Sequence, residues 1–216
     1  MKRVTVLNKL KKSGVIAVLR AHTKDEALKV TEAVINGGIT GIEVTFSVPQ
    51  AEEVIRKIRE LHSDYEELVI GAGTVLDAIT ARMAILAGAE YIVSPAFDKE
   101  TAEICNLYQV PYLPGCMTIT EISTALKAGV DIIKLFPGSS YNPNFINAVK
   151  GPLPQVNIMA TGGINVENMH QWFERGCVAI GVGGDLLAPA QNGDYAKVSE
   201  LAREYVDKLA EIRKGA

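Results

Sequence analysis

A lysine within an apolar segment is the strongest candidate for chemistry in this chain. Residues 130–137 have the composition of a buried strand, and this strand carries Lys134. Lysine is seldom buried without a partner, because desolvation disfavours its charged form. A neutral amine at the end of a buried strand can attack a carbonyl carbon and form a Schiff base. The alternative is a lysine whose stem follows the sheet while its ammonium group reaches solvent.

Other predicted strands also carry polar residues near their ends. One strand ends at Arg20, another ends at Thr74, and Glu43 lies within a third. In a β/α barrel the carboxyl ends of all strands surround the active site, so Arg20, Glu43 and Lys134 are expected to form one cluster. A carboxylate beside an amine supplies the proton transfer and the nucleophile that carbonyl chemistry needs. For each residue alone, the alternative is a charged strand end in solvent.

Two glycine-rich turns follow the last two predicted strands. Gly162 and Gly163 come after Thr161, and Gly183 and Gly184 come before Asp185. In a β/α barrel these two turns are the usual phosphate-binding loops, where backbone N–H groups face the anion. Tight turns also need glycine, so either pair alone would be a weak signal. Asp185 is an unfavourable neighbour for an anion, unless it caps the turn that follows.

Short apolar runs alternate with helical patterns along the whole chain. Such alternation predicts βαβ units and a parallel sheet. Eight runs favour an α/β fold, a (β/α)8 TIM barrel with an extra N-terminal helix, and a doubly wound open sheet is the alternative. The expected strands are 14–20, 41–46, 68–74, 91–97, 111–117, 131–137, 157–164 and 177–185, and clear helical patterns cover 24–36, 51–62, 77–87, 165–175 and 195–213.

A repeated glycine supports the closed barrel. Gly38, Gly88, Gly129 and Gly176 each stand between a helical pattern and the next strand, where glycine accommodates a left-handed helix end. Each of the three intervals between successive glycines spans two strand–helix units, and four such pairs of units make eight strands. No linker or change of composition divides the chain, and residues 1–216 are expected to form a single domain.

Composition limits the class of protein. The 216 residues are 48% hydrophobic and 22% charged with a net charge of −3, which is ordinary for a globular domain and gives no electrostatic case for nucleic acid or an anionic membrane. No segment resembles a signal peptide or a membrane span. The three cysteines form no CxxC pair, which favours a reducing compartment, and we expect a cytoplasmic protein.

Neither metal nor thiol chemistry is favoured. The three histidines (His22, His62 and His170) lack the spacing of metal ligands and are expected at the surface, so we expect no metal. The cysteines are expected in the core. Cys116 stands near a strand end and is expected to be the one that could line the pocket.

These residues together resemble the 2-dehydro-3-deoxy-6-phosphogluconate (KDPG) / 4-hydroxy-2-oxoglutarate (KHG) aldolase family. The resemblance runs from about residue 14 to 187, and the motifs come in the same order as in the family. It implies a class I aldolase on a β/α barrel, commonly a homotrimer, with no cofactor. The motifs that carry it are residues 17–20, 42–45, 71–75, 93–95, 114–118, 134–137 and 161–164.

The resemblance also implies roles for individual residues. Lys134 corresponds to the Schiff-base lysine of the family, and Glu43 corresponds to its proton-transferring acid/base. Arg20 and Thr74 correspond to residues that hold the pyruvyl carboxylate. The remaining substrate-binding residues implied are the pocket walls Pro95 and Phe136, together with Thr161, Gly162, Gly163, Gly183 and Gly184 around the phosphate.

Two positions depart from the family pattern. Some members carry an arginine where this chain has Ser47, so Arg20 is expected to supply the positive charge for the carboxylate. Many members carry a serine where this chain has Gly184, and a hydroxyl there would reach the phosphate or a distal hydroxyl group.

The resemblance implies a small 2-oxo acid as substrate. KDPG would give pyruvate and glyceraldehyde 3-phosphate, and KHG would give pyruvate and glyoxylate. One alternative is the galactonate isomer of KDPG. Others are a phosphate-binding barrel isomerase or epimerase with Glu43 as base, and a non-catalytic sugar-phosphate-binding protein.

Overall fold

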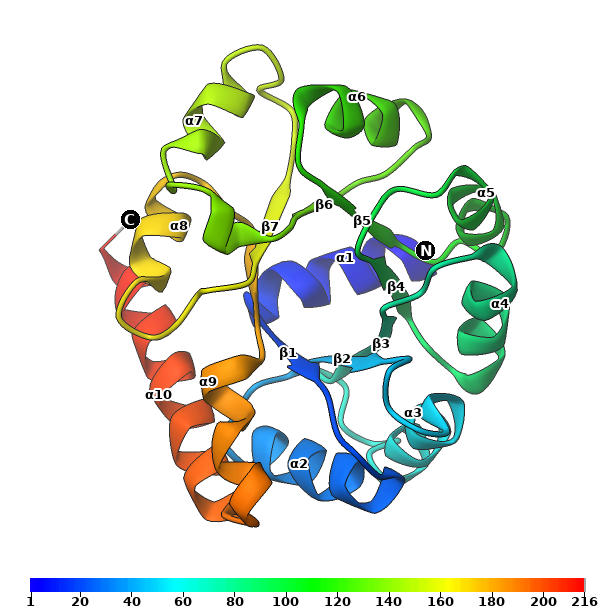
Figure 1. Cartoon of the computed structure of the whole chain (residues 1–216), viewed down its shortest axis with the longest axis vertical. Helices are drawn as coiled ribbons and strands as arrows, with labels where there is room; N and C mark the ends of the chain where they lie inside the picture. Colours follow the sequence, from blue (N-terminus) through cyan, green and yellow to red (C-terminus); the bar gives the residue numbers. More distant parts are fainter. Residues whose placement is uncertain (216) are drawn as a thin grey trace.

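The computed structural model describes residues 1–215 and contains a closed barrel of eight parallel strands (Figure 1). The barrel closes because β1 pairs with β8, as in the register Ala17↔Val182. This closure confirms the predicted barrel and excludes the open sheet. The strands are β1 (Val15–Leu19), β2 (Gly41–Thr45), β3 (Val69–Gly73), β4 (Tyr91–Ser94), β5 (Tyr112–Cys116), β6 (Ile133–Leu135), β7 (Ile158–Thr161) and β8 (Ala179–Val182).

Helices surround the strands, and several begin where a side chain accepts a hydrogen bond from the first turn (Figure 1). Thr23, Asp77, Asp98 and Thr118 are such N-caps. The outer helices are α2 (Lys24–Asn36), α3 (Ala51–Leu61), α4 (Ala78–Ala87), α5 (Lys99–Leu107), α6 (Ile119–Lys127), α7 (Phe145–Lys150), α8 (Met169–Glu174), α9 (Gly184–Leu187) and α10 (Tyr195–Lys214), with 3₁₀ turns η1 (Gly138–Ser140) and η2 (Ala188–Asn192).

The repeated glycines adopt the predicted conformation. Gly38, Gly88, Gly129 and Gly176 all have φ between 83° and 104°. A side chain at any of these positions would be strained, because L-residues avoid this region of backbone space. The glycine pattern therefore marks helix ends that the barrel requires.

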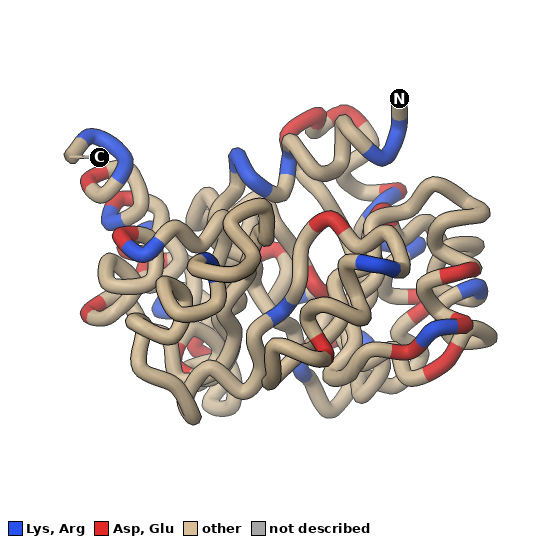
Figure 2. The backbone as a smooth tube through the Cα atoms, turned by 90° about the horizontal axis from the view of Figure 1, so that it is seen from above, with Lys and Arg blue, Asp and Glu red and all other residues tan. Residues whose placement is uncertain are grey.

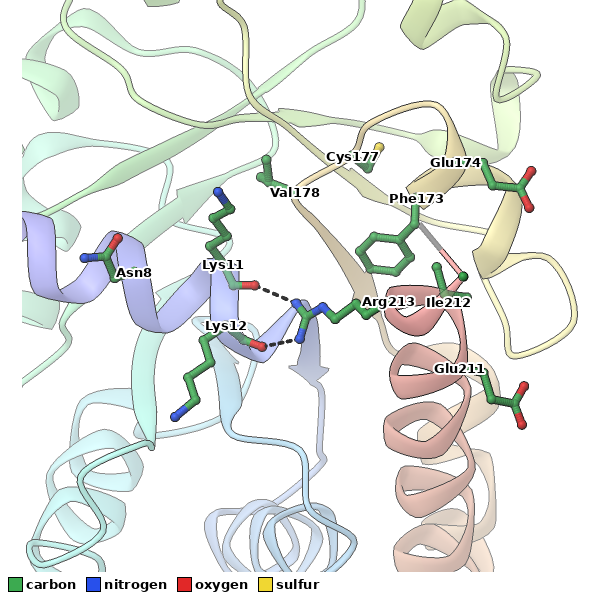
Figure 3. A pocket seen from close by; sticks show the side chains of 11 residues that line it. Asn8, Lys11, Lys12, Phe173, Glu174, Cys177, Val178, Glu211, Ile212 and Arg213 are labelled. Carbon is green, nitrogen blue, oxygen red and sulfur yellow. Dashed lines mark hydrogen bonds between the residues drawn. The ribbon is translucent and has the colours of Figure 1, made fainter.

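Helix α1 (Lys2–Ser13) covers the amino-terminal end of the barrel, where the expected extra helix is confirmed. Its buried Val6 and Leu10 pack among the residues that fill the barrel interior. Arg213 of α10 fastens the end of α1 by donating hydrogen bonds of 2.7 Å to the carbonyls of Lys11 and Lys12 (Figure 3). A hollow of about 730 Å³ lies beside this contact, at the opposite end of the barrel from the predicted active site.

The largest difference from the predicted elements is α8, which begins four residues later than the helical pattern at 165–175. Asn165 and Asn168 each accept a hydrogen bond from the other's backbone N–H at 3.0 Å. These reciprocal bonds favour a turn over a helix. Helix α10, which was predicted at 195–213, packs against α2 and β1.

Within residues 1–215, no helix has the length and apolar character needed to span a membrane. Figure 2 shows basic and acidic residues interspersed along the chain. This distribution agrees with the small net charge of −3.

Candidate active site

Lys134 and Glu43 meet inside the barrel, as their positions on the strands predicted. Lys134 Nζ lies 3.6 Å from Glu43 Oε1, and the two side chains are only 7% and 1% exposed. Neither carboxylate oxygen of Glu43 accepts a hydrogen bond within the described chain. Among the described residues, the Glu43 carboxylate thus has the ion pair with Lys134 but no hydrogen bond. Both groups are therefore free to exchange protons with a ligand.

Two neighbours shape the space around the pair. A Cβ at Gly73 would lie 2.6 Å from Cγ of Glu43, so only glycine leaves room for this carboxylate. On the other side, Lys134 Nζ lies 5.0 Å from the centroid of the Phe136 ring. Phe136 also lines a cavity at the carboxyl end of the barrel, so its ring connects the buried pair to that cavity.

The cavity has a volume of about 650 Å³, enough for a sugar-acid phosphate. It brings together most of the predicted substrate-binding residues. Thr74 and Pro95 follow β3 and β4 at the same end of the barrel, but they do not line this cavity. The predicted residues on its wall are Arg20, Phe136, Thr161, Gly162, Gly163, Gly183 and Gly184.

The two glycine-rich turns face the cavity with free donors. Within residues 1–215, no backbone acceptor takes a hydrogen bond from the N–H of Gly162, Gly163 or Gly183. Such donors fit an anionic group. Asp185 lines the same cavity, and among the described residues no side chain caps α9 or the 3₁₀ turn η2 that follows it, so the alternative of a capping role finds no support.

Two of the four glycines expected around the phosphate, Gly163 and Gly184, differ in their surroundings. Gly163 has φ 71°, and a Cβ there would lie 2.9 Å from Cβ of Ser139 in η1. Gly184 has no atom within 4 Å of a Cβ position. A side chain at Gly163 would thus disturb the fold itself, whereas a side chain at Gly184 would enter the cavity.

Thr161 and Thr74 each show an unusual feature. The Oγ1 atom of Thr161 is buried on the cavity wall and has no hydrogen-bond partner within the described chain. Thr74 has φ 55°, a region that β-branched residues rarely adopt. Unpaired buried hydroxyls and strained backbone both concentrate at ligand sites, because the fold must maintain them at a cost.

Sequence reasoning missed part of the cavity wall. His22 is exposed, as expected, but it also lines the cavity together with Glu26 and Gln191. The backbone N–H of His22 donates to Glu26 Oε2 at 2.8 Å, which holds the loop after β1 in place. The signal in the sequence was position, since His22 stands two residues after Arg20, just beyond a strand end.

Cys116 lies in the core, as expected for the cysteines, and it is not the pocket residue that its place near a strand end allowed. The residue belongs to the outer core between strands and helices and does not line the cavity. Burial raises the pKa of its thiol to about 12, so the group stays protonated. Among residues 1–215, no three His, Cys, Asp or Glu side chains gather closely enough to hold a metal ion.

Comparisons with known proteins show the family of this chain. A family model described as KDPG and KHG aldolase matches residues 6–201. The chain is 38% identical to the 2-dehydro-3-deoxy-6-phosphogalactonate aldolase of Escherichia coli (strain K12), over 84% of this chain and 88% of that protein. It is 33% identical to the 2-dehydro-3-deoxy-phosphogluconate aldolase of Treponema pallidum (strain Nichols), over 93% and 96% of the two chains.

A solved structure of KDPG aldolase from Legionella pneumophila, with pyruvate captured as a covalent carbinolamine, is similar in fold. Its TM-score to this chain is 0.83 at 26% identity, over 94% of this chain and 97% of that chain. The family model and the relatives span nearly the whole barrel. The chain therefore belongs to the KDPG and KHG aldolase family, and it is a lyase.

Proposed function

We propose that this aldolase cleaves KDPG to pyruvate and glyceraldehyde 3-phosphate, and that it also accepts KHG. The observation that carries the proposal is the buried pair of Lys134 and Glu43, 3.6 Å apart. The adjoining cavity offers free backbone N–H groups for a distal anion. The catalytic pair thus suits the ketone at one end of the substrate, and the N–H groups suit the phosphate at its other end.

In the proposed reaction, Lys134 passes a proton to Glu43, and its neutral amine then attacks the C2 ketone and forms a carbinolamine. Glu43 donates a proton to the carbinolamine hydroxyl, which leaves as water and gives a protonated imine. Glu43 then takes the proton of the C4 hydroxyl, and the C3–C4 bond breaks with its electron pair moving into the imine. The products at this stage are an aldehyde and an enamine. Protonation of the enamine at C3 and hydrolysis of the imine release pyruvate.

Other residues hold the two ends of the substrate. We propose that Arg20, the one lysine or arginine among the described residues that line the cavity, binds the pyruvyl carboxylate together with Thr74 at the end of β3. The turns at Gly162, Gly163, Gly183 and Gly184 would bind the phosphate through their N–H groups. The covalent carbinolamine of the Legionella relative supports attack of a lysine on pyruvate in this fold.

Trapping of the imine tests the reaction class. Incubation with pyruvate and sodium borohydride should add the mass of a reduced pyruvyl group to the intact chain. A barrel isomerase or epimerase that uses Glu43 only as a base would gain no mass. A non-catalytic binding protein would also remain unmodified.

The galactonate isomer of KDPG is the second candidate substrate. The E. coli relative at 38% identity is a 2-dehydro-3-deoxy-6-phosphogalactonate aldolase, whereas the Treponema relative is named for the gluconate isomer. The two substrates differ in configuration at C4, which is one of the two atoms of the bond that breaks. Comparison of kcat/KM for KDPG, its galactonate isomer and KHG decides between them, and a higher value for the galactonate isomer would overturn our assignment.

We also propose that the protein is a cytoplasmic homotrimer, and α4 supports the assembly. This helix turns its small residues Ala81, Ala84 and Ala87 toward the barrel and its large apolar residues outward. Ile79 and Leu86 are 77% and 67% exposed. Because a water-facing apolar helix stripe normally has a protein partner, a second copy is expected to cover it.

Molar mass in solution tests this assembly. Light scattering on the purified protein should give three times the chain mass, and Ile79→Glu should reduce the mass toward that of one chain. Val4→Glu, at an exposed position of α1, is the control and should leave the assembly unchanged. A monomeric wild-type protein would contradict the proposal.

A further inference from the structure

Strand β3 contributes no side chain to two positions of the barrel interior. Gly71 and Gly73 both point inward, two residues apart on the same face. Side chains from the neighbouring strands occupy the space that these glycines leave. Glu43 of β2 fills the place beside Gly73, and the ring of Tyr91 from β4 lies over Gly71, 2.5 Å from a Cβ position there.

Tyr91 reaches across β3 to the strand that carries Glu43. Its side chain is 0% exposed, and its hydroxyl donates a hydrogen bond of 2.7 Å to the carbonyl oxygen of Ile42. This carbonyl belongs to the peptide bond that joins Ile42 to Glu43. The hydroxyl therefore fixes the backbone immediately before the carboxylate side chain.

The register of the sheet explains why this bond can form. Glu43 pairs with Gly71, and Gly71 pairs with Tyr91, so the three residues lie in one row across β2, β3 and β4. A side chain at Gly71 would block the row. Without one, the ring of Tyr91 packs against Gly71, and its hydroxyl reaches the backbone of β2 next to Glu43.

The tyrosine supports the carboxylate without donating a hydrogen bond to it. The hydroxyl proton is committed to Ile42, and Glu43 accepts no hydrogen bond within the described chain. Burial and the negative charge of Glu43 hold the pKa of Tyr91 well above its ordinary value, so the phenol keeps that proton. The arrangement leaves Glu43 free to act on Lys134 and the substrate.

We propose that Tyr91 is a positioning residue for Glu43, acting through the Ile42 carbonyl and the glycine gap in β3. This inference rests on the proposed acid/base role of Glu43. It predicts an effect on the rate of proton transfer, with no effect on substrate binding.

Tyr91→Phe is the direct test, because it keeps the ring over Gly71 and removes only the hydroxyl. Thr31→Val is the matched control. The Thr31 hydroxyl is also buried and donates to a backbone carbonyl at 2.7 Å, but within α2. Since each variant loses one buried hydrogen bond, both should lower Tm by similar amounts.

The two variants should differ in activity. Tyr91→Phe should lower kcat about tenfold with KM unchanged, since small displacements of a catalytic group are costly. Exchange of the pyruvate methyl protons with deuterium from the solvent, which needs only imine and enamine formation, should slow by the same factor. The pH dependence of kcat should keep its midpoint, because the phenol does not titrate in the working range. Thr31→Val should leave all three unchanged.

Two results would overturn the inference. Wild-type kcat and exchange in Tyr91→Phe, with a lowered Tm, would mean that the tyrosine only stabilises the barrel. A raised KM with unchanged kcat would place its effect on binding. Glu43→Gln separates this failure from failure of the proposed function: if that variant is inactive while Tyr91→Phe is fully active, the acid/base role stands and the positioning role is wrong.

Discussion

Lys134 and Glu43 stand on strands directly across the barrel from one another, and their polar atoms are nevertheless 3.6 Å apart. A barrel of eight strands is normally filled by packed apolar side chains. Here the absence of a side chain at Gly73 opens the space in which the carboxylate meets the amine. A buried charge without a partner costs several kcal/mol, so each group makes the burial of the other tolerable.

Glu43→Gln should slow cleavage by about 10²- to 10⁴-fold, the usual contribution of general acid–base catalysis. The amide keeps the shape of the side chain but cannot exchange protons. Steady-state assays with KDPG measure the loss. Glu90→Gln is the control, since Glu90 is also nearly buried but pairs with Arg59 and does not line the cavity. It should lower Tm and spare kcat. Near wild-type turnover in Glu43→Gln would assign the proton transfers to another group.

Gly184→Ser should strengthen binding of phosphorylated substrates. No atom lies within 4 Å of the new Cβ, so the hydroxyl enters the cavity without displacing the fold. A hydrogen bond to a charged group contributes about 1.5–3 kcal/mol, which corresponds to a KM for KDPG lower by about tenfold or more. The KM for KHG should not change. Equal shifts for both substrates would argue against a phosphate site at this turn.

Gly163 lies in a turn that is expected to bind the phosphate, but Gly163→Ala does not separate phosphate binding from protein stability. The added methyl group would lie too close to Ser139, and the alanine would have to adopt a strained φ of 71°. We expect a lowered Tm and reduced activity on every substrate. Thermal unfolding beside assays with KDPG and KHG distinguishes this structural effect from a selective one.

The eight strands, the glycines at the helix ends and the pair of Lys134 and Glu43 could be predicted from the sequence, because each depends on local signals. Alternation of apolar runs locates strands, and a lysine in such a run is conspicuous. The sequence could not predict the wall made by His22, Glu26 and Gln191, since their meeting depends on how loops after different strands fold over the barrel. The role of Tyr91 was equally hidden, because an aromatic residue in a strand has no local feature that points to Glu43.

Thr161→Val should impair substrate use without destabilising the protein. The Thr161 hydroxyl is buried and unpaired, so its removal costs no internal hydrogen bond and Tm should stay constant or rise. We expect a substrate hydroxyl to form a hydrogen bond with the Thr161 hydroxyl. Loss of this one bond should lower kcat/KM for KDPG about tenfold. An unchanged kcat/KM would show that the hydroxyl faces away from the substrate.

The three cysteines should resist alkylation in the folded protein. Burial raises the pKa of the thiols of Cys105, Cys116 and Cys177 to about 12, so at pH 8 the reactive thiolate is nearly absent. Treatment with iodoacetamide at pH 8 should leave intact mass and activity unchanged. Unfolding in urea restores an ordinary pKa of about 8.5, and all three should then react. Rapid loss of activity in the native state would contradict their placement in the core.

The Schiff base itself is tested most directly by locating the trapped pyruvate. After borohydride reduction and proteolysis, mass spectrometry should find the pyruvyl group on Lys134 alone. Lys134→Ala should trap nothing, whereas Lys127→Ala, at an exposed position on α6, should trap as much as the wild type. Label on any other lysine, or trapping that persists in Lys134→Ala, would contradict the assignment of Lys134 as the nucleophile.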